Sequence, residues 1–382
     1  MGAPLEGICV VEVAGIGPGP FSGMILADLG ADVIQIHRSV AKREAPDPLD
    51  RGKRSVVLNL KHPAAVQALL RLADRADVLI EGYRPGVAER LGFGPELCLD
   101  RNPRLIYGRM TGWGQDGPLA GNAGHDINYI ALAGALEGLG RAGQPPTPPV
   151  NLVGDFGGGA MFLAVGVLAA LVERGLSGRG QVVDAAIVDG AALLMAIIYG
   201  MQGRGFWHQG RGTNLLDTGS ARYEVYQTAD DKWVSVGTLE ERFYRNLIRI
   251  LQLEGDPDME ADLNNGLRDL SGANSAKAKL KKVFRTRTRD EWCALLEGET
   301  EMCFAPVLDM NEAPEHPHLK SRGSFVEVGG IVQPAPAPRF GRSIVPTPAP
   351  APARGEHTEA VLSELGLSAA EIAELALAPD PR

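Results

Sequence analysis

The chain has 382 residues, of which 45% are hydrophobic and 22% charged, and its net charge is -9. The length exceeds that of one typical hydrophobic core and predicts two domains, while the acidic balance argues against a nucleic-acid partner, which needs a basic face. The four cysteines show no Cys-X-X-Cys spacing and none of the density of a disulfide scaffold, so a reduced, cytoplasmic protein is expected.

No targeting or membrane segment is expected either. The N-terminus lacks a basic stretch followed by an apolar one, and the last residues are not a Ser-Lys-Leu type of peroxisomal address. The longest apolar run, residues 160–172, is shorter than the roughly 20 residues that cross a membrane.

The first half of the chain alternates between strand and helix patterns. Apolar runs predict strands at residues 8–13, 32–37, 55–60, 77–81 and 105–110. Helices are predicted after the turn at 15–20 and at 63–75, and glycine-rich helices at 126–139 and 156–174. A strand end and an apolar helix follow over 182–199. This alternation predicts an α/β fold in which a parallel sheet carries helices on both faces.

The pattern changes after the loop at 203–219. Residues 223–228 and 232–237 flank Ala229-Asp230-Asp231 and predict a hairpin, and helices are predicted at 242–251, 276–284 and 289–297. This region is typical of a smaller α+β domain. The proline-rich residues 334–352 predict an extended strap, followed by a short helix at 368–375.

The turn Gly15-Ile16-Gly17-Pro18-Gly19-Pro20 is similar to a dinucleotide-binding turn but does not meet that template. Pro20 stands at the third glycine position, and the prolines remove backbone donors that would hold a pyrophosphate. We therefore expect a tight strand-to-helix turn and no NAD site.

Two possible acid–base groups lie at the start of apolar helical segments. His125 precedes the segment at 126–139, and a histidine, with an ordinary pKa of about 6.5, exchanges protons near neutral pH. Asp155 precedes Gly157-Gly158-Gly159, and those glycines permit close approach of a ligand or another helix. A structural histidine and an N-cap aspartate are the alternatives to a proton-transfer pair. The backbone N–H groups from Asp126 onward could hold an oxyanion.

Several cations follow the predicted strands, where ligands of open α/β sheets bind. Arg38, Lys61, Arg84 and Arg90 would suit a ligand with several phosphates, although each alone could be a solvated surface charge. Glu240, followed by Glu241, could be an ordinary acid in the first turn of a helix.

Longer motifs make the chain resemble the α-methylacyl-CoA racemase branch of the family III CoA-transferase (CaiB/BaiF-type) superfamily. The motifs are Ala123-Gly124-His125-Asp126-Ile127-Asn128-Tyr129, Asn151-Leu152-Val153-Gly154-Asp155-Phe156-Gly157-Gly158-Gly159 and Gly180-Gln181-Val182-Val183-Asp184-Ala185, with further matches at 11–20, 104–107 and 111–115. They are long, stand in the family's order and span nearly the whole chain.

The resemblance implies a large Rossmann-like domain and a small α+β domain in an interlocked homodimer. Each active site would lie between the large domain of one subunit and the small domain of the other. The expected division is a large CoA-binding domain at 1–200, a linker at 201–221, the small domain at 222–325, and a return strap with the C-terminal part of the large domain at 326–382.

The resemblance also implies the reaction, a racemase or epimerase that interconverts (2R)- and (2S)-2-methylacyl-CoA by proton transfer through an enolate. His125, paired with Glu240, would serve one face and Asp155 the other, while Asp126 would supply the oxyanion donor. The implied CoA-binding residues are Arg38, Leu58, Asn59, Leu60, Lys61, Tyr83, Arg84, Arg90, Gly124 and Tyr129. No metal and no separate cofactor is expected, because CoA is part of the substrate.

Two other functions stay open on the same scaffold. Transferases of the superfamily use an aspartate at the Asp155 position as a nucleophile and pass through an enzyme–CoA thioester. A non-catalytic acyl-CoA-binding protein is the third possibility. The chain departs from the usual family sequence at 215–221, 237–244 and 301–306, in the linker and small domain, which leaves the identity of the acyl group open.

Overall fold

The computed structural model describes residues 2–38, 47–208, 210–296 and 298–377. Contacts divide the chain into two compact units. Unit 1 comprises Met1–Ala133, Val150–Leu194 and Lys320–Arg382, and unit 2 comprises Gly134–Pro149 and Met195–Leu319. The expected large domain ran without a break to residue 200, so the structure differs in placing the loop Gly134–Pro149 in unit 2. An ion pair of 2.7 Å between Arg141 and the buried Glu224 ties this loop to unit 2.

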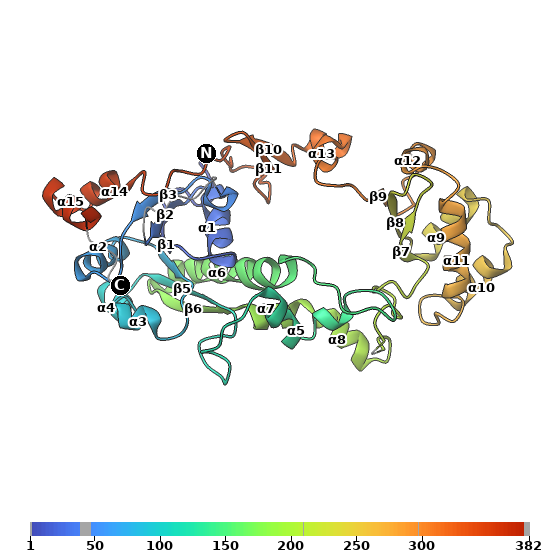
Figure 1. The fold of residues 1–382 in the computed structure, drawn as a ribbon, viewed down its shortest axis with the longest axis horizontal. Helices are drawn as coiled ribbons and strands as arrows, with labels where there is room; N and C mark the ends of the chain where they lie inside the picture. The colour runs from blue at the N-terminus through green and yellow to red at the C-terminus, as the bar shows by residue number, and fades with distance from the viewer. Residues whose placement is uncertain (1, 39–46, 209, 297, 378–382) are drawn as a thin grey trace. The chain divides into compact units, whose positions relative to one another are not determined.

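Unit 1 is built on a six-stranded sheet in the order β3-β2-β1-β4-β5-β6 (Figure 1). The strands are β1 (Cys9–Val13), β2 (Asp32–His37), β3 (Arg54–Val57), β4 (Val78–Glu81), β5 (Ile106–Thr111) and β6 (Gln181–Ala186). Every neighbouring pair is parallel. The predicted α/β class and parallel sheet are therefore confirmed, and all six carboxyl ends lie at one edge.

Helices cover both faces of this sheet because successive side chains of a strand point to opposite sides. Val11 packs on the face covered by α2 (Pro63–Ala73), α3 (Val87–Leu91) and α4 (Pro95–Arg101). Val10 packs on the other face, against α1 (Pro18–Asp28) and α6 (Met161–Ser177). The strands are thus buried on both sides, which agrees with their almost uninterrupted apolar sequences.

The C-terminal part of the chain returns to unit 1. Helix α14 (Thr358–Glu364) adds Val361 and Leu362 to the core that includes α2, and α15 (Ala369–Leu377) adds Ile372. The side chains of His357 and Thr358 accept the N–H groups of Ser55 and Val57 at 3.2 and 3.0 Å. These bonds satisfy donors of β3, the edge strand of the sheet.

A hairpin that the sequence analysis missed precedes the proline-rich strap. It consists of β10 (Phe325–Val328) and β11 (Ile331–Pro334). Arg51 anchors it, since its guanidinium donates to Gln333 and to the carbonyl of Pro334 while pairing with Asp28 of α1. Residues 335–353, where an extended strap is expected, contain no helix or strand.

The two glycine-rich helices differ from their predicted bounds. The first, α5 (Asp126–Leu132), ends before Gly134, whose φ of 79° leaves the helical region, and a single 3-10 turn, η2 (Leu136–Gly138), follows. The second begins earlier than expected, as the π-helix η3 (Leu152–Ala160), and runs on into α6. Wide π turns are rare and concentrate at functional sites.

Together η3 and α6 form one helix of 26 residues, Leu152–Ser177, which is long and apolar enough to cross a membrane by length and composition alone. The apolar run at 160–172 is thus part of a longer helix, because the sequence pattern did not show the two segments to be continuous. Leu163, Val167 and Ala170 are buried in the core that includes Ile106 and Ala185 of β5 and β6, so one face of this helix packs on the sheet of unit 1.

Unit 2 contains an antiparallel sheet in the order β7-β8-β9, formed by Tyr223–Gln227, Trp233–Gly237 and Phe304–Pro306. Its helices are α8 (Ala196–Gly203), α9 (Glu241–Ile250), α10 (Pro257–Asn265), α11 (Ala273–Phe284) and α12 (Arg289–Leu296), with η4 (Ala313–Glu315) beyond β9. The ring of Phe284 lies 5.0 Å from Tyr226 and 5.1 Å from Trp292, at the centre of the core. The predicted hairpin is present.

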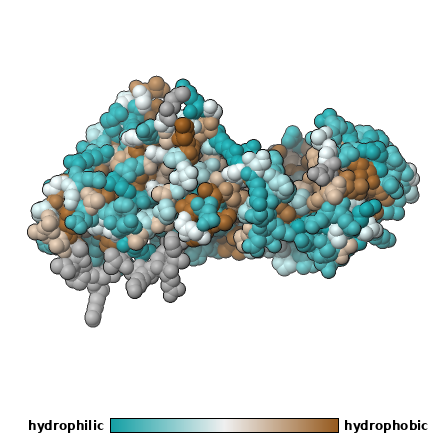
Figure 2. All heavy atoms as spheres, turned by 90° about the horizontal axis from the view of Figure 1, so that it is seen from above, coloured by the Kyte–Doolittle hydropathy of each residue, from teal (hydrophilic) through white to brown (hydrophobic). Residues whose placement is uncertain are grey.

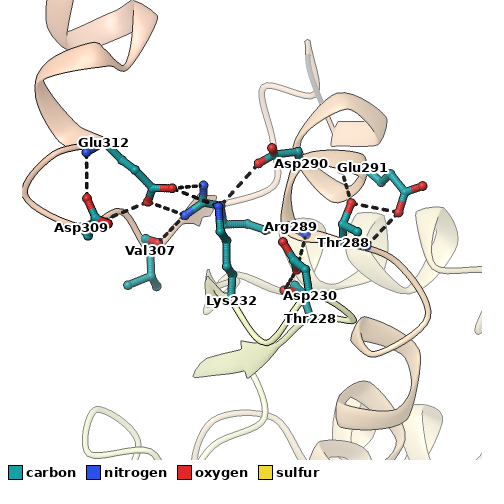
Figure 3. Close-up of polar contacts among 10 residues, drawn as sticks. All are labelled: Thr228, Asp230, Lys232, Thr288, Arg289, Asp290, Glu291, Val307, Asp309 and Glu312. Atoms are coloured by element: carbon teal, nitrogen blue, oxygen red, sulfur yellow. Dashed lines mark hydrogen bonds and ion pairs between the residues drawn. The ribbon is translucent and has the colours of Figure 1, made fainter.

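A cluster of polar contacts joins α12, the hairpin turn and the segment after β9 in unit 2 (Figure 3). Arg289 of α12 donates to both carboxylate oxygens of Glu312 at 2.7 Å, and its backbone N–H donates to Asp230 in the hairpin turn. Glu312 also accepts the N–H of Asp309. These hydrogen bonds hold the pKa of the Glu312 carboxyl well below its usual range. The cluster therefore ties the segment after β9 to both α12 and the hairpin.

The face seen in Figure 2 is mainly hydrophilic, with hydrophobic residues between the hydrophilic ones. Single exposed apolar side chains are normal on a protein surface. A larger set of exposed apolar side chains lies on unit 1.

Candidate active site

A cavity of about 340 Å³ opens at the carboxyl ends of the strands of unit 1. The turn after β1 forms one wall, Gly82, Tyr83 and Arg84 after β4 form another, and Thr111 to Trp113 after β5 a third. After β1 the chain continues to β2 on one side, and after β4 it continues to β5 on the other side. The point between β1 and β4, where the strand order reverses, is where open α/β sheets bind ligands. The cavity thus lies where the fold itself provides a binding crevice.

The turn at residues 15–20 lines this cavity directly. Gly17 has a φ of 72°, which favours glycine, and Pro18 and Pro20 start α1 without needing backbone donors. The strand order is that of dinucleotide-binding folds. This turn, however, presents few of the backbone N–H groups that would hold a pyrophosphate. The sequence predicted a tight strand-to-helix turn here and did not indicate that the turn forms part of the cavity wall.

His125 reaches the cavity from the N-cap of α5. His125 is exposed, and its backbone N–H donates to Oδ1 of Asn128 at 3.0 Å. This hydrogen bond fixes the start of the helix. The histidine therefore stands at the positive end of α5, next to N–H groups that have no acceptor within the helix.

Asp155 reaches the same cavity from η3. Burial, and after it the nearby charge of Asp126, raise the pKa of the Asp155 carboxyl, while a hydrogen bond from Asn151 and the charge of His125 act in the opposite direction. The N-cap explanation for Asp155 is wrong, because the helix starts earlier and Asn151 occupies the cap position. The structure thus brings His125 and Asp155 together at one cavity.

The glycines that follow Asp155 allow a helix, not a ligand, to approach. A Cβ on Gly158 would lie 2.6 Å from the backbone nitrogen of Ala191, and one on Gly190 would overlap the carbonyl of Gly158. Helix α7 (Ile187–Leu194) therefore packs backbone to backbone against η3. This contact decides between the two explanations that the sequence left open.

An aromatic pair completes the wall beside His125. Tyr129 is buried and lies edge-on to Trp113, with ring centroids 4.7 Å apart. Gly112 and Gly124 lie against the Tyr129 ring, which any Cβ at either position would overlap or crowd. The expected CoA contact Gly124 thus also makes room for this ring.

Only some of the expected CoA-binding residues line the cavity. Tyr83 and Arg84 line it, as do Gly124 and Tyr129. Arg38 follows β2 and is close enough to Tyr83 to oppose the rise in the Tyr83 pKa that burial causes. The residues outside the lining are Arg38, Leu58, Asn59, Leu60, Lys61 and Arg90, of which Leu58, Asn59 and Leu60 are buried and the three cations exposed.

Two further expected site residues, Asp126 and Glu240, do not line the cavity. Asp126 is buried behind the cavity, at the start of α5. Glu240 belongs to unit 2, where it is the exposed N-cap residue of α9. Its neighbour Glu241 pairs with Arg245 at 2.8 Å, whereas Glu240 forms no ion pair within the described part of the chain. Asn122, which also lines the cavity, was missed because it has no distinguishing pattern.

Comparison with known proteins agrees with this architecture. The sequence profile of CoA-transferase family III matches residues 5–358. The chain is 44% identical to α-methylacyl-CoA racemase of Mus musculus and 43% identical to that of Homo sapiens, in each case over 97% of this chain and 96% of the relative. A solved structure of a CaiB/BaiF family protein from Brucella suis superimposes with a TM-score of 0.82 at 24% identity, covering 96% of this chain and 100% of that one. The chain therefore belongs to CoA-transferase family III.

Proposed function

We propose that this protein is a racemase that interconverts (2R)- and (2S)-2-methylacyl-CoA by moving the α proton through an enolate. The two mammalian relatives named α-methylacyl-CoA racemase support this activity. The observation that carries the proposal is that His125 and Asp155 reach one cavity from two separate helix starts. Racemisation needs a proton-transfer group on each face of a planar intermediate, and this arrangement offers two.

The enolate is the difficult species in this reaction, because the α proton of a thioester is only weakly acidic. The N–H of Asp126 is the first of α5 and has no acceptor within the helix. Held in place by the fold, it can donate to the thioester oxygen as negative charge develops there. The partial positive charge of the helix start adds to this effect.

The two bases have separate tasks. His125, aided by Glu240, would remove or return the proton on the face of the S isomer, and Asp155 on the face of the R isomer. The raised pKa of Asp155 suits this role, since a carboxyl poised closer to neutral pH can both accept and donate a proton. The reaction requires no metal and no redox step.

The CoA portion would bind along the carboxyl edge of the sheet. Arg38, Lys61, Arg84 and Arg90 would face its phosphates. Tyr83 and Arg84, which line the cavity, would hold the part nearest the thioester.

We also propose that two chains form a homodimer in which Glu240 of one subunit completes the site of the other. Unit 1 exposes an apolar set on α5, η3, α6, β6 and α7, and such a set marks a protein interface. Its members are Leu132, Leu152, Met161, Val165, Val172, Leu176, Val182, Leu193 and Leu194.

The test is deuterium incorporation at C2 of a panel of 2-methylacyl-CoA esters in heavy water, with the stereochemistry followed. The wild type should exchange and invert the α position, and His125→Ala should lose about 100- to 10,000-fold of the rate, the contribution of a general acid–base group. Exchange that survives unchanged in His125→Ala would overturn the assignment. A covalent CoA adduct on Asp155, formed in the presence of a carboxylate acceptor, would instead favour the transferase.

A further inference from the structure

The proposed mechanism uses the backbone of Asp126 but leaves its carboxyl group without a task. That side chain is buried, and its Oδ2 atom has no hydrogen-bond partner among the described residues. A buried carboxylate oxygen without a donor costs free energy. Asp126 follows His125 directly in the chain, so this unfavourable burial lies beside the proposed reacting groups and suggests a specific role for the carboxyl group.

The other oxygen of Asp126 holds the backbone of Asp155. Its Oδ1 accepts the N–H of Asp155 at 2.6 Å, across 29 positions of the chain. In η3 the first bond within the helix runs from the N–H of Phe156 to the carbonyl of Asn151, so the N–H of Asp155 has no acceptor in its own helix. Asp126 therefore caps the π-helix at the residue whose side chain enters the cavity.

Gly154 makes this contact possible. A Cβ at position 154 would overlap Oδ1 of Asp126. On the opposite side, Oδ2 of Asp155 would lie 3.3 Å from a Cβ added to Gly17. The Asp155 residue is thus held between the carboxyl of Asp126 behind it and the turn of the cavity wall in front of it.

The charge of Asp126 acts on Asp155 as well. The groups that face Asp155 are Asp126, His125 and Tyr129 of the α5 segment and the neutral donor Asn151. The turn before α1 presents Gly17, and Asp189 of α7 acts on Asp184 instead. Asp126 is the nearby group that raises the pKa of Asp155 beyond what burial does.

We propose that the side chain of Asp126 is a positioning residue for Asp155, so that one helix start both carries His125 and aligns the acid on the opposite face. The hydrogen bond sets the place of the Asp155 carboxyl in the cavity, and the negative charge keeps a proton on it more readily. This inference rests on the proposed racemase function and adds a residue whose side chain does not line the cavity.

The experiment compares Asp126→Asn and Asp126→Ala with the wild type and with the exposed Asp116→Asn as a control. The asparagine keeps an acceptor at Oδ1 and removes the charge, whereas the alanine removes both, and neither changes the backbone N–H. The rate of α-proton exchange is measured separately from the (2R) and (2S) esters across pH, with folding checked by thermal unfolding.

Removing the negative charge of Asp126 lowers the pKa of Asp155. In Asp126→Asn the acid limb of the pH–rate profile should therefore move to lower pH for the (2R) ester, whereas the acid limb for the (2S) ester should stay in place. Asp126→Ala should in addition lose up to about 100-fold in kcat on the (2R) ester with little change in KM, as expected for a misplaced reacting group. Asp116→Asn should match the wild type on both esters.

Gly154→Ala provides a second variant that displaces the Asp126 carboxyl without changing any charge. It should reproduce the kcat loss on the (2R) ester without the shift of the acid limb. The inference would be overturned if the acid limb of the pH–rate profile of Asp126→Asn did not move, or moved equally for both esters. A wild type that exchanges neither ester would overturn the proposed function itself, so the two failures are distinguishable.

Discussion

At the scale of single residues, the proposed proton-transfer role of Asp155 is in conflict with stability. Burial and the charge of Asp126 raise its pKa in the folded protein above the ordinary value of about 4 in the unfolded chain. Such a group contributes fully to stability at a pH below its unfolded pKa, and this contribution is lost as the pH rises through the folded pKa. Asp155 therefore contributes less to stability at neutral pH than at acid pH.

We predict that Asp155→Asn abolishes exchange from the (2R) ester yet raises the melting temperature at neutral pH. The gain should disappear below about pH 4, where the wild-type carboxyl is protonated in both states. Calorimetry from acid to neutral pH measures this, with the exposed Asp116→Asn as control. A gain that stays constant across the range would contradict the electrostatic explanation.

Lys53 illustrates a buried charge with a structural task behind the cavity. Its Nζ donates to Glu12 at 2.7 Å and to the carbonyl of Pro20 in the cavity wall at 2.9 Å, and both charged side chains are fully buried. Glu12 also accepts a hydrogen bond from Gln35 at 2.8 Å. The pair thus holds the turn after β1 from inside the core.

Removing one partner of this pair leaves the other as an isolated buried charge. Lys53→Met should lower the free energy of unfolding by about 3–5 kcal/mol, and adding Glu12→Gln should recover part of this loss. Urea unfolding measures both variants. Arg245→Met, which breaks an exposed pair with Glu241, should cost less than about 1 kcal/mol. Equal costs for Lys53→Met and Arg245→Met would show that burial does not govern the effect.

At the scale of elements, the contact between η3 and α7 depends on glycines. Gly190→Ala would place a Cβ against the carbonyl of Gly158, and overpacking of this kind costs about 1–3 kcal/mol or more. Because η3 carries Asp155, the same change should also reduce kcat. Gly175→Ala is the matched control, since it lies in α6 with open space around it and should stabilise the helix by roughly 0.5–1 kcal/mol. If both variants shift the unfolding midpoint alike, the close packing of α7 against η3 does not require a glycine at position 190.

The predicted elements were most accurate where the apolar pattern is strictly local. The strands of the parallel sheet were predicted to within a few residues, since each is a short apolar run between turn residues. Helix ends were less accurate: α5 ends at Leu132 because Gly134 turns the chain away, and η3 starts at Leu152, before the glycines. Helix α10 was missed although Asp256 and Pro257 form an N-terminal signal.

At the scale of the whole molecule, the apolar set on unit 1 bears on the proposed dimer. We expect sedimentation to give twice the chain mass of 40.5 kDa. Val172→Glu, at a side chain of α6 that is 72% exposed, should weaken association by about 10-fold or more, since a charge buried at an interface costs at least ~1.4 kcal/mol. Leu97→Glu on α4 is the control and should leave association unchanged. A monomeric wild type would contradict the proposed assembly.

The sequence by itself determined the α/β class, the parallel sheet, and the motifs around His125 and Asp155 that identified the family. These features are local, because periodicity, turn residues and motif spacing are properties of neighbouring residues. Only the tertiary structure decided that Asp126 caps Asp155, that α7 fills the space beside Gly158, and that Lys53 supports Pro20 from the core. Each of these contacts joins residues 29 or more positions apart. Such contacts depend on how whole elements pack, which no single segment of the sequence contains.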